Sequence, residues 1–157
     1  MRSLVLILAV FLVAGAQTGR NNATDPQDDR SDPITTLSSY YEAVNSRDFR
    51  RAYGYWESPK QSYEQFERGF ADTERVHLLI EPPPHLEGAA GSSFAEISTI
   101  VVATTRSGNE RIFAGCYTLR KSNVSDTGWH IYRGELSPAP SNARVSRILA
   151  QGCRNTR

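Results

Sequence analysis

Lysine, histidine and cysteine are scarce in this chain of 157 residues, which contains two, three and two of them respectively. The 18 basic and 17 acidic side chains nearly balance and are scattered along the sequence. Proteins that bind nucleic acid or an anionic membrane surface by charge carry a basic patch or stripe. The composition therefore predicts no nucleic-acid partner.

Motifs for metal binding and nucleophilic catalysis are also missing. His77, His85 and His130 have no carboxylate partner at the spacing typical of metal ligands. No Gly-x-Ser-x-Gly sequence occurs, and the glycine-rich segment 88–93 lacks the Gly-Lys-Ser/Thr ending of a phosphate-binding loop. We therefore expect no metal and no other cofactor.

The one long apolar run lies near the N-terminus, at residues 4–13. Ten apolar residues after a basic start suit the central region of a signal peptide and are too few to span about 30 Å of hydrocarbon. Small residues follow at positions 14–16, as signal peptidase requires. We predict a signal peptide over residues 1–16, cleaved between Ala16 and Gln17.

An uncleaved membrane anchor is the alternative to cleavage. Extending the apolar run to residue 16 gives thirteen residues, fewer than the roughly twenty that a spanning helix needs. A bacterial lipoprotein would need cysteine in place of Ala16. Residues 17–32 contain no large apolar side chain and are predicted to be a flexible leader. We expect residues 33–153 to form one domain, periplasmic or secreted and without a membrane anchor.

The two cysteines are Cys116 and Cys153. An even number of cysteines in an exported chain favours a disulfide, whereas two buried free thiols are the alternative. In the chain-entropy model, closing a loop of about 37 residues stabilises the fold by about 3–4 kcal/mol. A disulfide also agrees with an oxidising destination.

Helical periodicity dominates the first half of the domain. Asp32 and Pro33 are a good start for a helix of about twelve residues with one apolar stripe. Asp48 opens a second short helix, and Ser62 with Gln65 forms a capping-box pattern that opens a third. We predict three short N-terminal helices, rich in aromatic side chains.

The second half changes to strand periodicity. The predicted strands are 76–80, 94–105, 111–120 and 129–136, with a loop at 88–93. A last helix is predicted over 141–150, with Val145, Ile148 and Leu149 toward the core. Helices followed by long antiparallel strands give an α+β fold with segregated elements.

Three segments carry a resemblance to a known family. Residues 40–56 resemble the opening helix pair of NTF2-like domains, and residues 113–123 and 128–132 resemble the long strands of exported members. The resemblance covers roughly residues 34–136. It implies a cone of three N-terminal helices packed on a curved antiparallel sheet of about four strands, with a short C-terminal helix. It also implies a homodimer formed through the sheet.

The resemblance brings no activity with it, because this fold serves enzymes, binding modules and passive subunits. We expect a non-catalytic domain that binds a small apolar ligand or a protein partner. The alternative is an acid–base enzyme of the isomerase or dehydratase type, with a base and a tyrosine inside the cone. The aromatic side chains either line a pocket or simply fill the cone. The candidate pocket residues are Tyr41, Trp56, His77, Glu96, Tyr117 and Tyr132.

Overall fold

The computed structural model describes residues 28–142 and 144–154. The predicted signal peptide, its cleavage site and residues 17–27 of the predicted leader lie outside the described residues. Residues 28–32 lie against the domain: the Arg30 guanidinium stacks 4.2 Å from the Tyr55 ring centroid, and the Arg30 carbonyl accepts the Trp129 N–H. No helix in the described part of the chain is long and apolar enough to cross a membrane.

Three helices open the fold, as predicted. They are α1 (Pro33–Asn45), α2 (Phe49–Gly54) and α3 (Tyr63–Gly69). The Asp32 carboxylate accepts the first free N–H groups of α1. Ser62 and Gln65 form the predicted capping box at the start of α3. The helices therefore begin where the sequence places a side chain that accepts their free N–H groups.

The strands form one antiparallel sheet of five. They are β1 (Thr73–Ile80), β2 (His85–Ala89), β3 (Ser92–Thr105), β4 (Glu110–Ser122) and β5 (Trp129–Pro138). The order is β1-β3-β4-β5, and β2 pairs with the end of β3 that β1 leaves free. The prediction of a loop at 88–93 is wrong. Strand β2 extends to Ala89, and only a tight turn with Gly91 at φ 76° separates it from β3.

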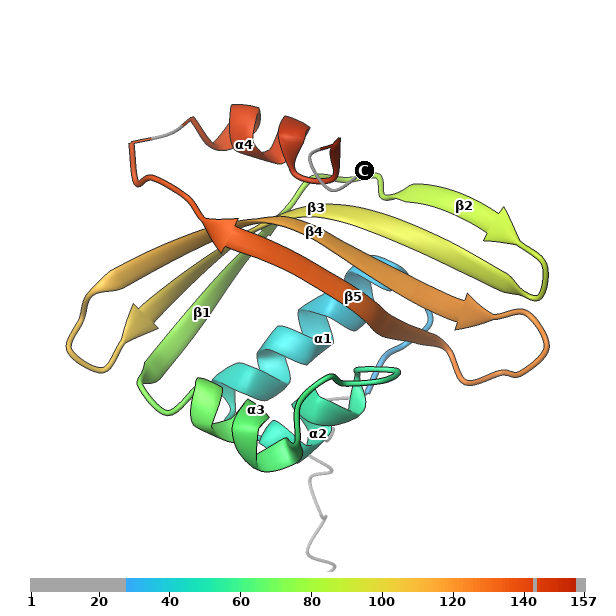
Figure 1. The fold of residues 1–157 in the computed structure, drawn as a ribbon, viewed down its shortest axis with the longest axis horizontal. Coiled ribbons are helices and arrows are strands. Elements are labelled where there is room, and N and C mark those ends of the chain that lie inside the picture. Colours follow the sequence, from blue (N-terminus) through green and yellow to red (C-terminus); the bar gives the residue numbers. More distant parts are fainter. Residues whose placement is uncertain (1–27, 143, 155–157) are drawn as a thin grey trace, which may run out of the picture.

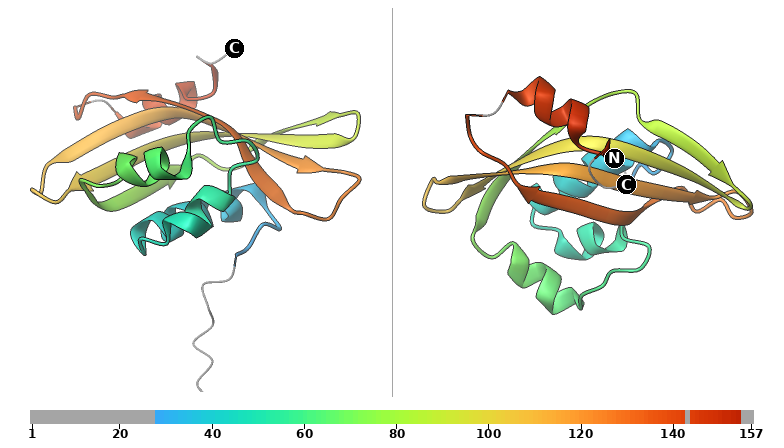
Figure 2. Two further views of the ribbon diagram at one scale, coloured as in Figure 1. Left: turned by 60° about the horizontal axis from the view of Figure 1, so that its bottom comes forward. Right: turned by 45° about the horizontal axis from the view of Figure 1, so that its top comes forward.

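The sheet separates two layers of helix (Figures 1 and 2). Helices α1, α2 and α3 cover its inner face, and the core lies between them. Helix α4 (Val145–Gln151) lies on the outer face. The buried core includes Leu37, Tyr40, Tyr41, Phe66, Ile97, Tyr117, Leu119 and Ile131.

The C-terminal helix corrects one prediction. It starts at Val145 rather than 141, none of its side chains is buried, and Val145 itself is 49% exposed. The expected packing of α4 into the core is wrong because the helix docks on the opposite face of the sheet. The predicted disulfide between Cys116 and Cys153 is confirmed, with 4.7 Å between their Cα atoms, and it fastens the end of α4 to β4.

Candidate functional site

Two tyrosines meet at the inner end of the cone. Tyr41 projects from α1 and Tyr117 from the inner face of β4, and both are almost fully buried. Their hydroxyl oxygens lie 2.6 Å apart and share a hydrogen bond, and their rings meet edge to face at 6.2 Å. The two hydroxyls therefore satisfy each other inside the core.

Burial also determines the charge state of this pair. Removal from water raises the pKa of Tyr117 to about 12, and the hydrogen bond from Tyr41 lowers it by less. Burial raises the pKa of Tyr41 well above its usual value, and the nearby Tyr117 raises it further. Both groups are neutral phenols near neutral pH, where they donate and accept hydrogen bonds but do not act as bases.

Trp56 separates the tyrosine pair from the outside. It follows α2, and its ring lies 6.3 Å from that of Tyr117. A parallel bridge to Ile131 fixes its backbone beside β5, and flanking hydrogen bonds join Tyr55 and Glu57 to the same residue. The backbone of Trp56 is thus held by the edge strand of the sheet and not only by helix packing.

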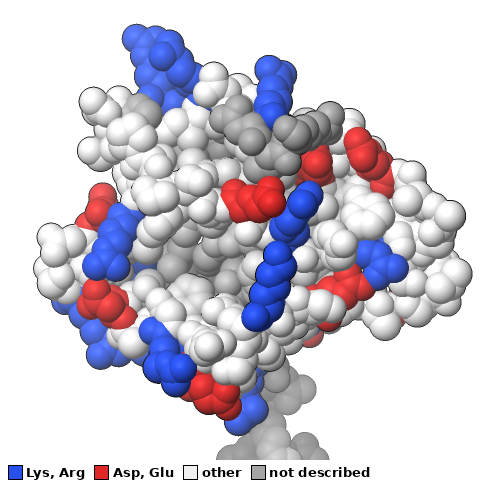
Figure 3. All heavy atoms as spheres, in the orientation of Figure 1, with Lys and Arg blue, Asp and Glu red and all other residues white. Residues whose placement is uncertain are grey.

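A pocket of about 250 Å³ opens on the other side of Trp56. It lies between the segment that joins α2 to α3 and strand β5, on a face where Figure 3 shows a hollow next to a row of Lys and Arg side chains. Trp56 and Phe66 supply its large apolar side chains. Its lining residues are Trp56, Ser58, Pro59, Lys60, Gln61, Phe66, Tyr132, Arg133 and Gly134.

Gly134 lines this pocket and lets two aromatic rings approach the strand. A Cβ atom at this position would lie 2.6 Å from Cε1 of Tyr117 and 3.1 Å from Cη2 of Trp56, so only glycine lets both rings lie against the β5 backbone. The opposite wall is fixed as well. The Tyr53 hydroxyl donates to the Gln61 carbonyl at 2.7 Å, and the capping box at Ser62 follows directly. The pocket is therefore largely preformed.

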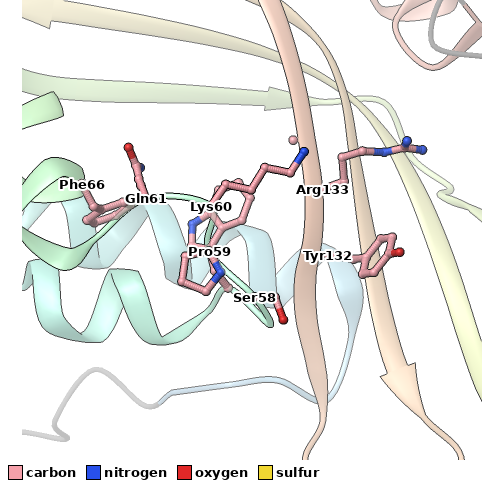
Figure 4. Close-up of a pocket in the computed structure, with 9 residues that line it drawn as sticks. Ser58, Pro59, Lys60, Gln61, Phe66, Tyr132 and Arg133 are labelled. Carbon is pink, nitrogen blue, oxygen red and sulfur yellow. The ribbon is translucent and has the colours of Figure 1, made fainter.

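Polar groups border the pocket on the side of the connecting segment. Figure 4 shows the Lys60 side chain reaching toward β5, whereas the Tyr132 and Arg133 side chains point away from the segment 58–61. Tyr132 is an extra residue in β5, since Thr118 pairs with Arg133 but the next residue pairs with Ile131. Its ring is 52% exposed and contacts Phe94.

The structure brings together three of the six predicted pocket residues: Tyr41, Trp56 and Tyr117. His77 is exposed and follows the buried Val76, so its side chain projects from the outer face of β1. Glu96 lies between the buried Ala95 and Ile97, so its side chain also projects from the outer face of the sheet. Neither enters the cone, so neither joins the pocket for which the sequence made them candidates. Tyr132 lines the pocket beside Trp56, but its side chain points away from the segment 58–61 (Figure 4).

Glu96 belongs to a separate cleft of about 520 Å³ on the outer face. This cleft lies between the β1–β2 connection and the C-terminal segment, and it includes His85, Ser98 and Cys153. Among the described residues, no group of three or more histidine, cysteine or acidic side chains is placed to hold a metal ion. The cleft is lined mainly by polar groups, unlike the pocket beside Trp56.

Two pocket residues that matter, Lys60 and Gly134, were not singled out from the sequence. Lys60 is one of only two lysines and stands in a polar segment between two aromatic helices, which could have drawn attention to it. Gly134 interrupts a strand pattern, and such a glycine often marks a close approach of other groups to the backbone.

Comparison with known proteins places the fold. No known protein family and no curated protein matches the chain. An NTF2-like superfamily protein from Salmonella enterica superposes with a TM-score of 0.50 at 16% identity, covering 69% of this chain and 89% of the other. A conserved protein from Planctomyces limnophilus superposes with a TM-score of 0.49 at 16% identity, and the match covers 68% of this chain and 94% of the other. A protein of unknown function from Mycobacterium tuberculosis superposes with a TM-score of 0.49 at 16% identity, and the match covers 78% of this chain and 87% of the other.

The fold of this chain is therefore NTF2-like, which confirms the resemblance seen in residues 40–56, 113–123 and 128–132. The helices and the antiparallel sheet agree with the predicted α+β cone, with five strands instead of about four. At this level of identity the likeness concerns the fold alone.

Proposed function

We propose that the domain binds a small, largely apolar molecule in the pocket between the α2–α3 connection and β5. The preformed cavity beside Trp56 and Phe66 carries this proposal, because apolar walls with a few polar groups at the rim are typical of ligand sites. A volume of about 250 Å³ limits the ligand to a small molecule of up to about three rings. The core next to this pocket contains both aromatic and aliphatic side chains.

We further propose that this binding takes place outside the cytoplasm, in the periplasm or after secretion. The apolar run and the small residues before Gln17 support export. The disulfide is compatible with an oxidising compartment, where such bonds persist.

An acid–base enzyme remains the alternative to a binding domain. Such an enzyme needs a group that takes up a proton near neutral pH within reach of the substrate. The described residues lining the pocket include no carboxylate and no histidine, and the tyrosines behind Trp56 have raised pKa values. We therefore rank binding ahead of catalysis.

The test uses N-phenyl-1-naphthylamine, an uncharged probe with an aromatic body that fluoresces in apolar surroundings. We expect the oxidised domain to bind it saturably. Gln61→Trp should reduce binding, because the larger ring would occupy the pocket from its rim. Glu64→Trp is the matched control, since residue 64 is exposed on α3 and does not line the pocket. Equal binding by the two variants would contradict the proposed site.

A further inference from the structure

The charged residues that line the pocket are of one sign, although Glu135 pairs with one of them. Lys60 and Arg133 are the only charged residues among the described ones that line it, and both are basic. The pocket walls thus offer an apolar surface next to positive charge, without a carboxylate to neutralise it from within. A neutral ligand would leave this arrangement unused.

The two basic residues differ in what they can reach. Nη1 of Arg133 lies 3.6 Å from Oε1 of Glu135, and its side chain points away from the segment 58–61 (Figure 4). The exposed side chain of Lys60 instead extends across the pocket toward β5. Lys60 is therefore the cation that a molecule in the pocket would meet.

We infer that the ligand is an organic anion with an aromatic or alicyclic body and one acidic group. The body packs on Trp56 and Phe66, and the acidic group meets the ammonium of Lys60 at the rim. The Ser58 hydroxyl and the Gln61 amide belong to the same rim and offer further hydrogen-bond donors. This inference rests on the proposed function and specifies the chemical class of its ligand.

The size of the effect follows from the exposure of Lys60. An ion pair near the surface contributes about 0.2–1 kcal/mol, which corresponds to an affinity gain of up to about fivefold. Salt screens such a pair strongly, because the Debye length falls from roughly 10 Å at 0.1 M to roughly 3 Å at 1 M. Lys60 therefore selects among ligands, and apolar contact supplies most of the affinity.

Two probes with the same aromatic body separate charge from apolar contact. They are 1-anilinonaphthalene-8-sulfonate, which carries one negative charge, and the uncharged N-phenyl-1-naphthylamine. We expect the sulfonate to bind more tightly and to lose this advantage at high salt. Lys60→Met keeps an apolar stem but removes the charge, so it should weaken sulfonate binding about two- to fivefold and change binding of the uncharged probe by a smaller factor.

Arg133→Ala is the matched control, because it removes a basic side chain from the same pocket that points away and pairs with Glu135. It should change the ratio of the two affinities less than Lys60→Met does. Equal affinities for both probes, or an unchanged ratio in Lys60→Met, would overturn the anion inference while leaving the pocket intact. If neither probe binds, the proposed function itself fails.

Discussion

At the scale of single residues, the tyrosine pair shows how burial limits chemistry. Tyr41 and Tyr117 satisfy each other's hydroxyl at 2.6 Å, and Trp56 lies between them and the pocket. A buried hydroxyl without a partner lowers stability by about 1–3 kcal/mol. The hydrogen bond between the two tyrosines avoids this loss for both hydroxyls. The pair is thus better suited to fixing the position of α1 on β4 than to transferring protons.

This burial predicts a loss of stability in alkali. Tyr117 ionises near pH 10 in the unfolded chain and near pH 12 in the folded one. Its contribution, about 2–3 kcal/mol, is fully present below pH 10 and is lost as the pH rises through 12. We expect the unfolding free energy of Tyr117→Phe to fall less steeply over this range, as measured by urea unfolding.

Ile97→Val serves as the control for that experiment, because it removes a methyl group from the buried core and no titrating group. This variant should keep the slope of the unmodified protein between pH 10 and 12. A Tyr117→Phe variant with the same slope would show that ionisation of Tyr117 does not drive the alkaline transition.

Gly134 predicts a second residue-scale effect. Gly134→Ala places a methyl group 2.6 Å from Tyr117 and 3.1 Å from Trp56, so one of the rings must move. We expect a loss of about 1–3 kcal/mol of stability, typical of overpacking, and weaker binding of apolar probes. Gly88→Ala is matched to it, because it also lies in a strand but meets no atom within 4 Å, and it should change stability by less than about 0.5 kcal/mol. Equal melting temperatures in the two variants would contradict this account.

The sequence predicted part of this site for a physical reason. Tyr41, Trp56 and Tyr117 are large aromatic residues on the apolar side of their elements, and apolar periodicity places such residues inside. The positions of Lys60 and Gly134 depend on which strand lies beside the α2–α3 connection. That depends on the pairing of Trp56 with Ile131, two residues far apart in the chain, which local patterns do not reveal.

At the scale of elements, local patterns succeed where an element carries its own pattern. Helices α1 and α3 were predicted from caps and apolar stripes, and both caps are present. Strand β2 was missed because all five of its residues are exposed and therefore show no alternation of apolar and polar side chains. Only its pairing with β3 makes it a strand. Helix α4 was assigned to the wrong side because an apolar stripe does not say which face of a sheet it will meet.

The attachment of α4 predicts how this helix responds to loss of the disulfide. Gly152 lies so close to β4 that a Cβ atom there would be 2.6 Å from the Gly115 carbonyl oxygen, yet no α4 side chain is buried. In a variant with Cys116→Ala and Cys153→Ala, we expect a loss of up to about 3–4 kcal/mol. Amide exchange over 145–151 should accelerate, whereas β4 stays protected. Unchanged protection of these α4 amides would mean that apolar contact alone holds the helix.

At the scale of the whole molecule, α4 affects self-association. A homodimer through the sheet, as the family resemblance implies, would use the outer face, but α4 packs there against β3 and β4. Ile100, which points to this face, is only 2% exposed. We therefore expect the oxidised protein to be a monomer by light scattering. If it is a dimer, the uncovered end near Phe94 and Tyr132 is the contact, and Tyr132→Glu should dissociate it.

Export and oxidation lead to a joint prediction for the whole chain. If residues 1–16 direct export, protein recovered from outside the cytoplasm starts at Gln17 and its mass lacks those residues. The mass is lower by two further hydrogens because a disulfide joins Cys116 and Cys153. Intact-mass measurement with and without alkylation tests both parts at once. Ala16→Leu should block cleavage, because signal peptidase needs a small residue there, and it should leave the folded domain unchanged. A cleaved product with two alkylatable thiols would separate export from oxidation, and an uncleaved chain would contradict the signal peptide.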